Sequence, residues 1–347
     1  MNPYVLSMLL MSLGLGTTLT FVSSHWLLAW MGLEINTLAI IPLLAQHHHP
    51  RAVEATTKYF LTQATAAALI LFASTTNAWL TGEWNIFQLS HPLPVIIMTM
   101  ALALKLGIAP THFWLPEVLQ GLDLITGLFL STWQKLAPFA LILQLNSFSS
   151  TLTIALGLAS TLIGGWGGLN QTQLRKILAY SSIAHLGWMF IVVQFNPTLM
   201  LLTMLTYIIM TTSAFLSFKA LASTSLQSLA MSWVKSPALL ITLPLALFSL
   251  AGLPPLGGFA PKWFILHELT KQDLPLTALI AALSALLSLY YYLRISYVMA
   301  LTISPSPSMN LTTWRHYSSP TSLLALSTST SLLILPLAPT ALALLSP

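Results

Sequence analysis

The chain has 347 residues, of which 56% are hydrophobic and only 5% are charged. No soluble core of this length needs that much apolar surface, so the composition excludes an ordinary soluble enzyme and indicates an all-α polytopic membrane protein. The sequence has no cysteine, which excludes disulfides, iron–sulfur ligation and thiolate metal sites, and its net charge of +5 comes from scattered basic residues, so no nucleic-acid partner is expected.

Apolar stretches of about 20 residues, broken by Pro, Asn and charged residues, predict eleven membrane-spanning helices. The first stretch lacks a basic region, so it predicts a spanning helix and not a cleaved signal peptide. We expect the spans near 3–22, 25–45, 57–80, 93–119, 122–143, 149–170, 173–194, 197–222, 238–266, 274–298 and 321–345.

Basic residues outside the spans fall almost entirely on one side of the predicted membrane. The loops and helix ends after odd-numbered spans carry only Lys271. Those after even-numbered spans carry Arg51, Lys58, Arg175, Lys176, Lys219, Lys235, Arg294 and Arg315. Because positive residues stay on the cytoplasmic or matrix side, the N-terminus is expected there and the C-terminus on the opposite side.

Four ionisable side chains lie within apolar spans. Glu34, Lys105 and Lys135 are near the middle of the second, fourth and fifth spans, and Lys262 lies in the ninth. A lysine at the centre of a membrane helix costs about 3 kcal/mol on insertion scales. A structural Glu34–Lys105 pair that only neutralises itself is one interpretation. It leaves two lysines without a central carboxylate, which indicates groups that release and rebind protons.

Two predicted spans are interrupted beside a buried lysine. Gly107 and Pro110 follow Lys105 in the fourth span, and a run of Gly and Pro precedes Lys262 in the ninth. Proline removes a backbone donor and glycine loosens a helix, so we expect two discontinuous helices. An ordinary proline kink is the alternative at each position.

The two interrupted spans are an odd number of spans apart and therefore run in opposite directions. Interrupted segments in corresponding positions are typical of transport sites built from inverted repeats. We therefore expect one transmembrane domain over residues 1–347, with a first repeat over about 3–143, a second over about 149–298 and a C-terminal helix over about 321–345.

Histidines give weaker indications. His112 lies two turns beyond Lys105 and would share its face on a continuous helix, and His185 lies near the middle of the seventh span. A buried histidine is more often a hydrogen-bonded core residue than a proton relay, and both interpretations stay open here. The run His47–His49 has no further ligand cluster beside it, which favours an interfacial loop over a metal site.

Three stretches carry a family likeness. KLGIAPTHFWLPEVLQG, LRKILAYSSIAHLGW and LAGLPPLGGFAPKW resemble signature stretches of the antiporter-like subunits of respiratory complex I. The resemblance covers essentially the whole chain. It implies a core of antiporter-like inverted repeats, without the first three helices that most members have.

The resemblance also implies roles for the buried residues. Glu34 matches the charge-switch glutamate of the family and Lys105 its partner lysine. Lys135 matches the central relay lysine, and Lys262 the terminal lysine toward the outlet. His185 matches a polar position between those last two, and His112 falls in the motif after the broken helix without a defined role.

The function implied by the resemblance is proton translocation across the inner mitochondrial membrane, coupled to electron transfer from NADH to ubiquinone. NADH, FMN, iron–sulfur clusters and ubiquinone are then expected on other subunits, with no cofactor or metal in this chain. Expected partners are neighbouring antiporter-like and small membrane-arm subunits, and lipids such as cardiolipin. The N-terminus would face the matrix and the C-terminus the intermembrane space. A sodium/proton antiporter subunit and a structural spacer that does not pump remain alternatives.

Overall fold

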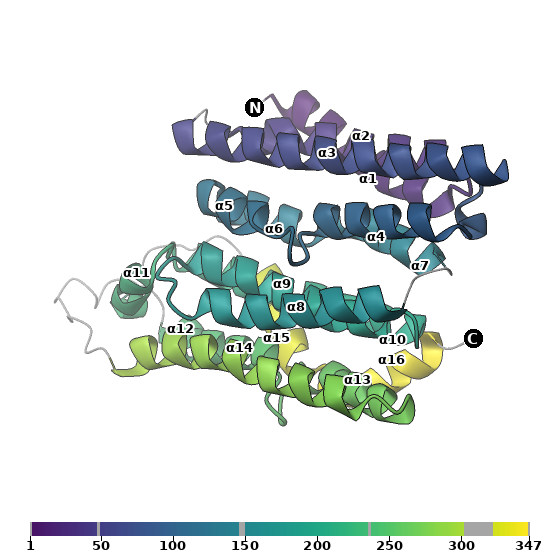
Figure 1. Ribbon diagram of the computed structural model, residues 1–347. Helices are drawn as coiled ribbons and strands as arrows, with labels where there is room; N and C mark the ends of the chain where they lie inside the picture. Colours follow the sequence, from purple (N-terminus) through teal and green to yellow (C-terminus); the bar gives the residue numbers. More distant parts are fainter. Residues whose placement is uncertain (1, 47–48, 146–149, 235–236, 302–321, 346–347) are drawn as a thin grey trace. The chain divides into compact units, whose positions relative to one another are not determined.

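The computed structural model describes residues 2–46, 49–145, 150–234, 237–301 and 322–345 (Figure 1). Within these residues every regular element is a helix, and the β pairings are two isolated bridges. Six helices are long and apolar enough to cross a membrane, or seven when a bent C-terminal pair counts as one span. The prediction of an all-helical polytopic membrane protein is therefore confirmed.

The helices follow one another with short connections. They are α1 (Pro3–Val22), α2 (Trp26–Leu44), α3 (Pro50–Thr81), α4 (Pro92–Leu106), α5 (Trp114–Gly121), α6 (Leu124–Ser131), α7 (Trp133–Gln144), α8 (Ser150–Gly168), α9 (Leu174–Val192), α10 (Pro197–Ala220), α11 (Leu226–Ala230), α12 (Pro237–Ala251), α13 (Phe259–Lys271), α14 (Pro275–Leu301), α15 (Ser322–Leu333) and α16 (Ala338–Leu345). Single turns of 3₁₀ helix lie at Ile86–Gln88, Met231–Val234 and Leu335–Leu337.

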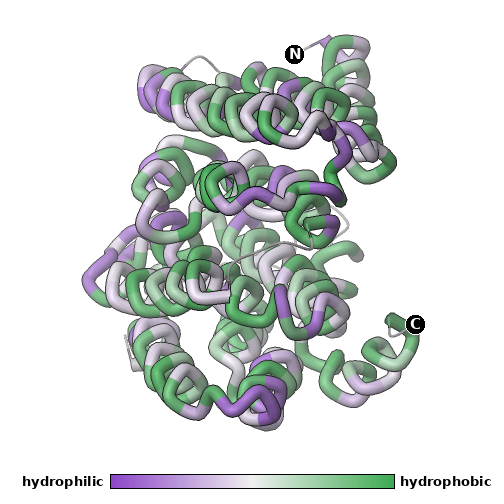
Figure 2. The backbone as a smooth tube through the Cα atoms, turned by 45° about the vertical axis from the view of Figure 1, so that its right-hand side comes forward, coloured by the Kyte–Doolittle hydropathy of each residue, from purple (hydrophilic) through white to green (hydrophobic). Residues whose placement is uncertain are grey.

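The chain forms two compact units, Met1–Ser160 and Thr161–Pro347. In the first unit α3 packs against α2, α4 and α5, while α7 packs against α1, α2 and α4. In the second unit α10 is central and packs against α9, α12, α13, α15 and α16. Figure 2 shows mostly apolar residues along the helices and more hydrophilic residues at helix ends and connections.

Two helices end at a glycine in the left-handed backbone region. Gly107 ends α4 with φ of 77° and Gly252 ends α12 with φ of 81°. The residue after each glycine donates its N–H back to the helix, from Ile108 to the Ala103 oxygen and from Leu253 to the Phe248 oxygen. This is the Schellman arrangement, which satisfies carbonyls at a helix end and favours glycine. The ends of α4 and α12 therefore have the same local cause.

Alanine at Gly252 should destabilise the protein by about 1–2 kcal/mol, because side chains other than hydrogen disfavour the left-handed region. An added Cβ would also lie 3.0 Å from Lys262 Cδ. The midpoint of thermal unfolding of the purified protein should fall. Gly14→Ala is the matched control, since its Cβ would meet nothing within 4 Å in helix α1. An unchanged midpoint for Gly252→Ala would contradict the capping role.

The stretch predicted as one span over 122–143 is divided at Thr132 into α6 and α7. The Ser131 and Thr132 hydroxyls both donate to the Leu128 carbonyl oxygen, at 3.0 and 2.7 Å. Hydroxyls that bond the preceding turn compete with the backbone ladder and bend helices. Lys135 consequently lies in the first turn of α7, and not in mid-helix as expected.

The predicted span over 321–345 is also divided, because α15 and the segment Leu335–Leu345 are bent by 65°. The predicted span over 57–80 begins earlier, at Pro50, whose fixed φ suits the first turn of a helix. Four residues used in the sequence arguments, His47, His48, Lys235 and Arg315, lie outside the described residues.

Candidate functional site

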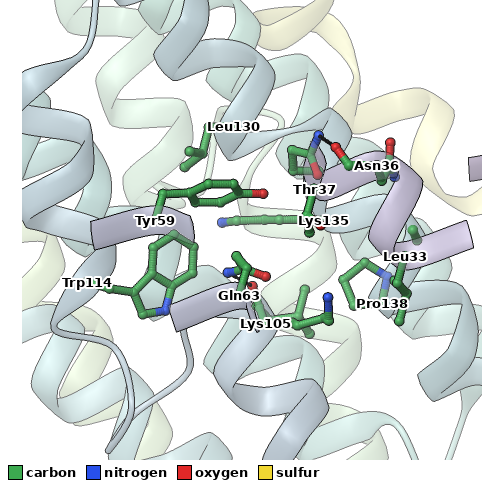
Figure 3. A pocket seen from close by; sticks show the side chains of 13 residues that line it. Leu33, Asn36, Thr37, Tyr59, Gln63, Lys105, Trp114, Leu130, Lys135 and Pro138 are labelled. Atoms are coloured by element: carbon green, nitrogen blue, oxygen red, sulfur yellow. Dashed lines mark hydrogen bonds between the residues drawn. The ribbon is translucent and has the colours of Figure 1, made fainter. Parts of the chain in front are cut away.

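The first unit contains a cavity of about 20 Å³. That volume suffices for about one water molecule. Helices α2 to α7 all contribute side chains to its wall (Figure 3). The lining residues are Leu33, Asn36, Thr37, Tyr59, Gln63, Lys105, Leu106, Trp114, Leu130, Gln134, Lys135, Ala137 and Pro138.

Lys105 and Lys135 both line this cavity, with exposed fractions of only 6% and 3%. Lys105 lies in the last turn of α4, where the negative end of the helix dipole favours a cation. Its Nζ has no hydrogen-bond partner among the described residues. Burying an ammonium without a hydrogen-bond acceptor costs free energy. A group in the cavity that accepts hydrogen bonds from Lys105 Nζ would lower that cost. The structure thus brings together two of the predicted relay residues.

The carbonyls at the end of α4 are held by side chains from neighbouring helices. The Trp114 indole Nε1 donates to the Leu104 oxygen at 3.1 Å, and Gln63 Nε2 donates to the Lys105 oxygen at 3.4 Å. These bonds replace the helical partners that the break removes. They fix the backbone that carries Lys105.

Glu34 is half-buried on α2 and its Oε2 accepts a hydrogen bond from Thr37 Oγ1 at 3.0 Å. Its charge interacts electrostatically with Lys105. The ion pairs of the described residues join other groups, Lys58 with Glu54 and Glu117, and Lys271 with Glu268. A direct Glu34–Lys105 salt bridge, one of the two interpretations of this pair, is therefore not formed in this structure.

The second unit has its own cavity, also of about 20 Å³, lined by His185 and Lys262. The Lys262 Nζ donates to the Ala251 oxygen at 2.8 Å and lies 5.8 Å from the centre of a Trp188 ring. Ala251 is the last residue of α12, so the ammonium satisfies a carbonyl left free at that helix end. The ring face adds a cation–π attraction.

His185 shares this cavity with Tyr207, whose ring centroid is 5.6 Å from that of the histidine. Both project from neighbouring helices, α9 and α10. The structure therefore places His185 with Lys262, and the second pair of predicted relay residues faces one water-sized space.

His112 lies in neither cavity. It is 3% exposed, in the segment between α4 and α5, and its Nδ1 lies 3.3 Å from the Pro110 oxygen. Because α4 ends at Leu106, the continuous helix on which His112 would share a face with Lys105 is not formed. Among the described residues, no group of three or more His, Asp and Glu side chains is placed to hold a metal ion.

Four of the polar residues that line the first cavity were not predicted from the sequence, namely Asn36, Tyr59, Gln63 and Gln134. Each is a polar side chain within an apolar helix. That signal was present in the sequence, but only the fold shows that the four face the same space as the lysines.

Matches to known protein families first show the class of membrane protein to which the chain belongs. Residues 23–288 match the family model described as NADH:quinone oxidoreductase/Mrp antiporter, TM. Residues 289–342 match the model for the NADH dehydrogenase subunit 2 C-terminus. Together these place the chain among antiporter-like membrane proteins.

Individual relatives narrow the class. A chain from Gadus morhua named NADH-ubiquinone oxidoreductase chain 2 is 68% identical, and the match covers 100% of both chains. A chain of respiratory complex I from Thermus thermophilus is similar in structure, with a TM-score of 0.82 and 28% identity over 97% of this chain and 80% of that one. A chain of the Mrp complex from Dietzia shares the fold, with a TM-score of 0.81 at 18% identity over 97% of this chain and 74% of its own. The chain belongs to the NADH-ubiquinone oxidoreductase chain 2 family.

Proposed function

We propose that this chain is a membrane-arm subunit of respiratory complex I and that it helps to move protons across the inner mitochondrial membrane. The enzyme oxidises NADH and reduces ubiquinone, and this chain contributes no redox centre to that reaction. Protons would pass by way of Glu34, Lys105, Lys135, His185 and Lys262. Membership of the chain 2 family supports the assignment to complex I.

The observation that carries the relay is the placement of two buried lysines and one half-buried lysine against two water-sized cavities. Lys105 and Lys135 line one, and Lys262 lines the other with His185. A buried amine accepts and releases protons only if water or a polar side chain reaches it. Each cavity supplies that contact in an otherwise apolar surrounding, which suits stepwise proton transfer without covalent chemistry.

We further propose eleven membrane crossings arranged as two inverted repeats over about 3–143 and 149–298, followed by a C-terminal helix. The equivalent glycine caps at Gly107 and Gly252 support this, because each ends a helix beside a lysine that lines a cavity. The N-terminus would face the matrix and the C-terminus the intermembrane space, as the basic residues predict.

Neighbouring antiporter-like and small membrane-arm subunits would cover the apolar faces of the chain, together with lipids such as cardiolipin. NADH, FMN, iron–sulfur clusters and ubiquinone would bind elsewhere in the complex. His112 stays a secondary candidate, since it is buried near the end of α4 but faces neither cavity.

A sodium/proton antiporter subunit is the second candidate, and the fold shared with the Mrp complex favours it. The two functions differ in their need for sodium. In proteoliposomes that contain the assembled complex, NADH oxidation should generate the same pH gradient in potassium buffer as in sodium buffer. A gradient that forms only with sodium would support the antiporter function instead.

A further inference from the structure

Helix α15 packs closely onto the second unit through a face of small side chains. Its buried residues are Leu324, Ser327, Thr328 and Ser331, which fall on one side of the helix, and the helix packs against α10 and α12. The hydroxyls of this face donate to carbonyls of α15 itself, as Ser331 Oγ does to the Thr328 oxygen at 2.8 Å. Because these hydroxyls need no partner outside α15, the small side chains let the helix approach its neighbours closely.

The end of α15 meets the connection between α12 and α13, residues 252–258. Ile334 lies at the bend of 65° between α15 and the segment Leu335–Leu345. A Cβ built on Gly257 would overlap the Cγ2 methyl group of Ile334, and it would lie only 2.8 Å from the Ser331 carbonyl oxygen. The connection therefore has no room for a side chain larger than hydrogen where α15 meets it.

The same connection forms part of the wall of the cavity in the second unit. Gly258 lines that cavity and lies so close to α12 that a Cβ on it would overlap the Ser249 carbonyl oxygen. Lys262 follows in the first turn of α13, and its Nζ donates to the Ala251 oxygen at 2.8 Å. The connection is thus held between α15 at Gly257 and α12 at the next residue. A shift of the connection would move the start of α13, and with it the side chain of Lys262.

We propose that Ile334 is a positioning residue for Lys262. Its Cγ2 methyl group holds the connection at Gly257 against α12, which keeps Gly258 in the wall of the cavity and Lys262 Nζ within reach of the Ala251 oxygen. Protein interiors are close-packed, so removing a methyl group from this contact lets the connection move. The cavity volume of about 20 Å³ corresponds to about one water molecule, and such a movement changes whether the cavity admits one. This inference rests on the proposed function, since it adds a residue that holds one member of the proposed relay.

Ile334→Leu tests this role, because leucine has a similar volume and polarity but no branch at Cβ, so the Cγ2 methyl group is lost. In the assembled complex, NADH-driven proton translocation should slow by about tenfold, within the range of up to a hundredfold that a displacement of about 1 Å causes. A high-resolution density map should show Lys262 Nζ displaced from the Ala251 oxygen. Ile334→Val keeps the branch and should retain both the bond and most of the rate.

Gly257→Ala changes the same contact from the opposite side. Its added methyl group would overlap Ile334 Cγ2 and should slow translocation to a similar extent. Ile334→Ala removes the overlapped carbon, so the double variant should regain part of the rate that Gly257→Ala loses. The regain should be partial, because the Ser331 oxygen stays close to the new methyl group. Such recovery requires direct contact between the two positions, which a general loss of stability does not produce.

Ile241→Leu is the matched control. Ile241 lies on α12 with an exposed fraction of 62%, outside the cavity of the second unit. Translocation per assembled complex should be unchanged in this control. The inference would be overturned by equal losses in Ile241→Leu and Ile334→Leu, by normal translocation in Ile334→Leu, or by slow translocation with the Lys262–Ala251 bond intact. If Lys262→Met translocates normally in the assembled complex, the proposed function itself fails, and not only the role of Ile334.

Discussion

Replacing Lys135 with methionine should stop proton transfer through this chain while leaving the complex assembled. Methionine has a similar length but no titratable group, so the relay loses a member that must carry a proton. Loss of a positioned acid–base group slows proton transfer by about 10²-fold or more. The measurement is the number of protons translocated per NADH oxidised in proteoliposomes, together with the rate of NADH oxidation.

Assembly should survive this substitution for a physical reason. Lys135 is 3% exposed, and a lysine within a membrane span costs free energy that an apolar side chain of similar volume does not. A loss of pumping would then report on transfer and not on folding. Native gels or mass photometry of the purified complex would establish the amount assembled.

Lys58→Met is the matched control for charge removal. Lys58 is 42% exposed on α3 and forms surface ion pairs with Glu54 and Glu117. Such pairs contribute only about 0–1 kcal/mol to the free energy of unfolding, so the complex should assemble normally and its pumping should be unchanged. Normal pumping in Lys135→Met would instead support a structural spacer and reject the relay.

The ionisable residues within the spans could be identified from the sequence, because charged residues are rare in membrane-spanning segments. Glu34, Lys105, Lys135 and Lys262 stand out in a chain with so few charged residues. The Gly and Pro residues beside Lys105 and Lys262 could be read from the sequence in the same way, although the left-handed glycine caps could not. Such signals are local, so they need no knowledge of which helices are neighbours.

The features of the site that could not be predicted from the sequence are contacts between segments far apart in the chain. The bond from Lys262 to the Ala251 oxygen joins two helices, and the cavity that Lys105 and Lys135 line is built by several helices. The break at Thr132, where two hydroxyls bond the preceding turn, was not predicted from the sequence. Serine and threonine make such bonds in intact helices too, so the sequence alone does not identify a break.

The surroundings of Glu34 also depend on residues of other helices. Its carboxylate interacts with Lys105 through the electric field and not through a salt bridge, while Thr37 Oγ1 holds it on its own helix. A carboxylate that forms no salt bridge with Lys105 can change the energy of its ammonium without trapping it in a pair. We therefore propose that Glu34 acts as a switch and not as one half of a structural pair.

Glu34→Gln should therefore slow proton translocation strongly, and its effect should depend on Lys105. Glutamine keeps an oxygen for Thr37 Oγ1 but removes the negative charge. If Glu34 acts through Lys105, then Glu34→Gln should add little once Lys105→Met is present. A double-mutant cycle on translocation rates should give a coupling of about 1 kcal/mol or more, while independent sites add to within about 0.5 kcal/mol.

Glu83→Gln controls for loss of a carboxylate, because Glu83 is exposed just beyond the end of α3. It should leave translocation unchanged. Additive effects of Glu34→Gln and Lys105→Met would mean that Glu34 acts on a different group, and the first step of the relay would have to be redrawn. A strong coupling with normal assembly would mean that one carboxylate on α2 controls the lysine at the end of α4, which is the electrostatic link that proton pumping without a local redox centre requires.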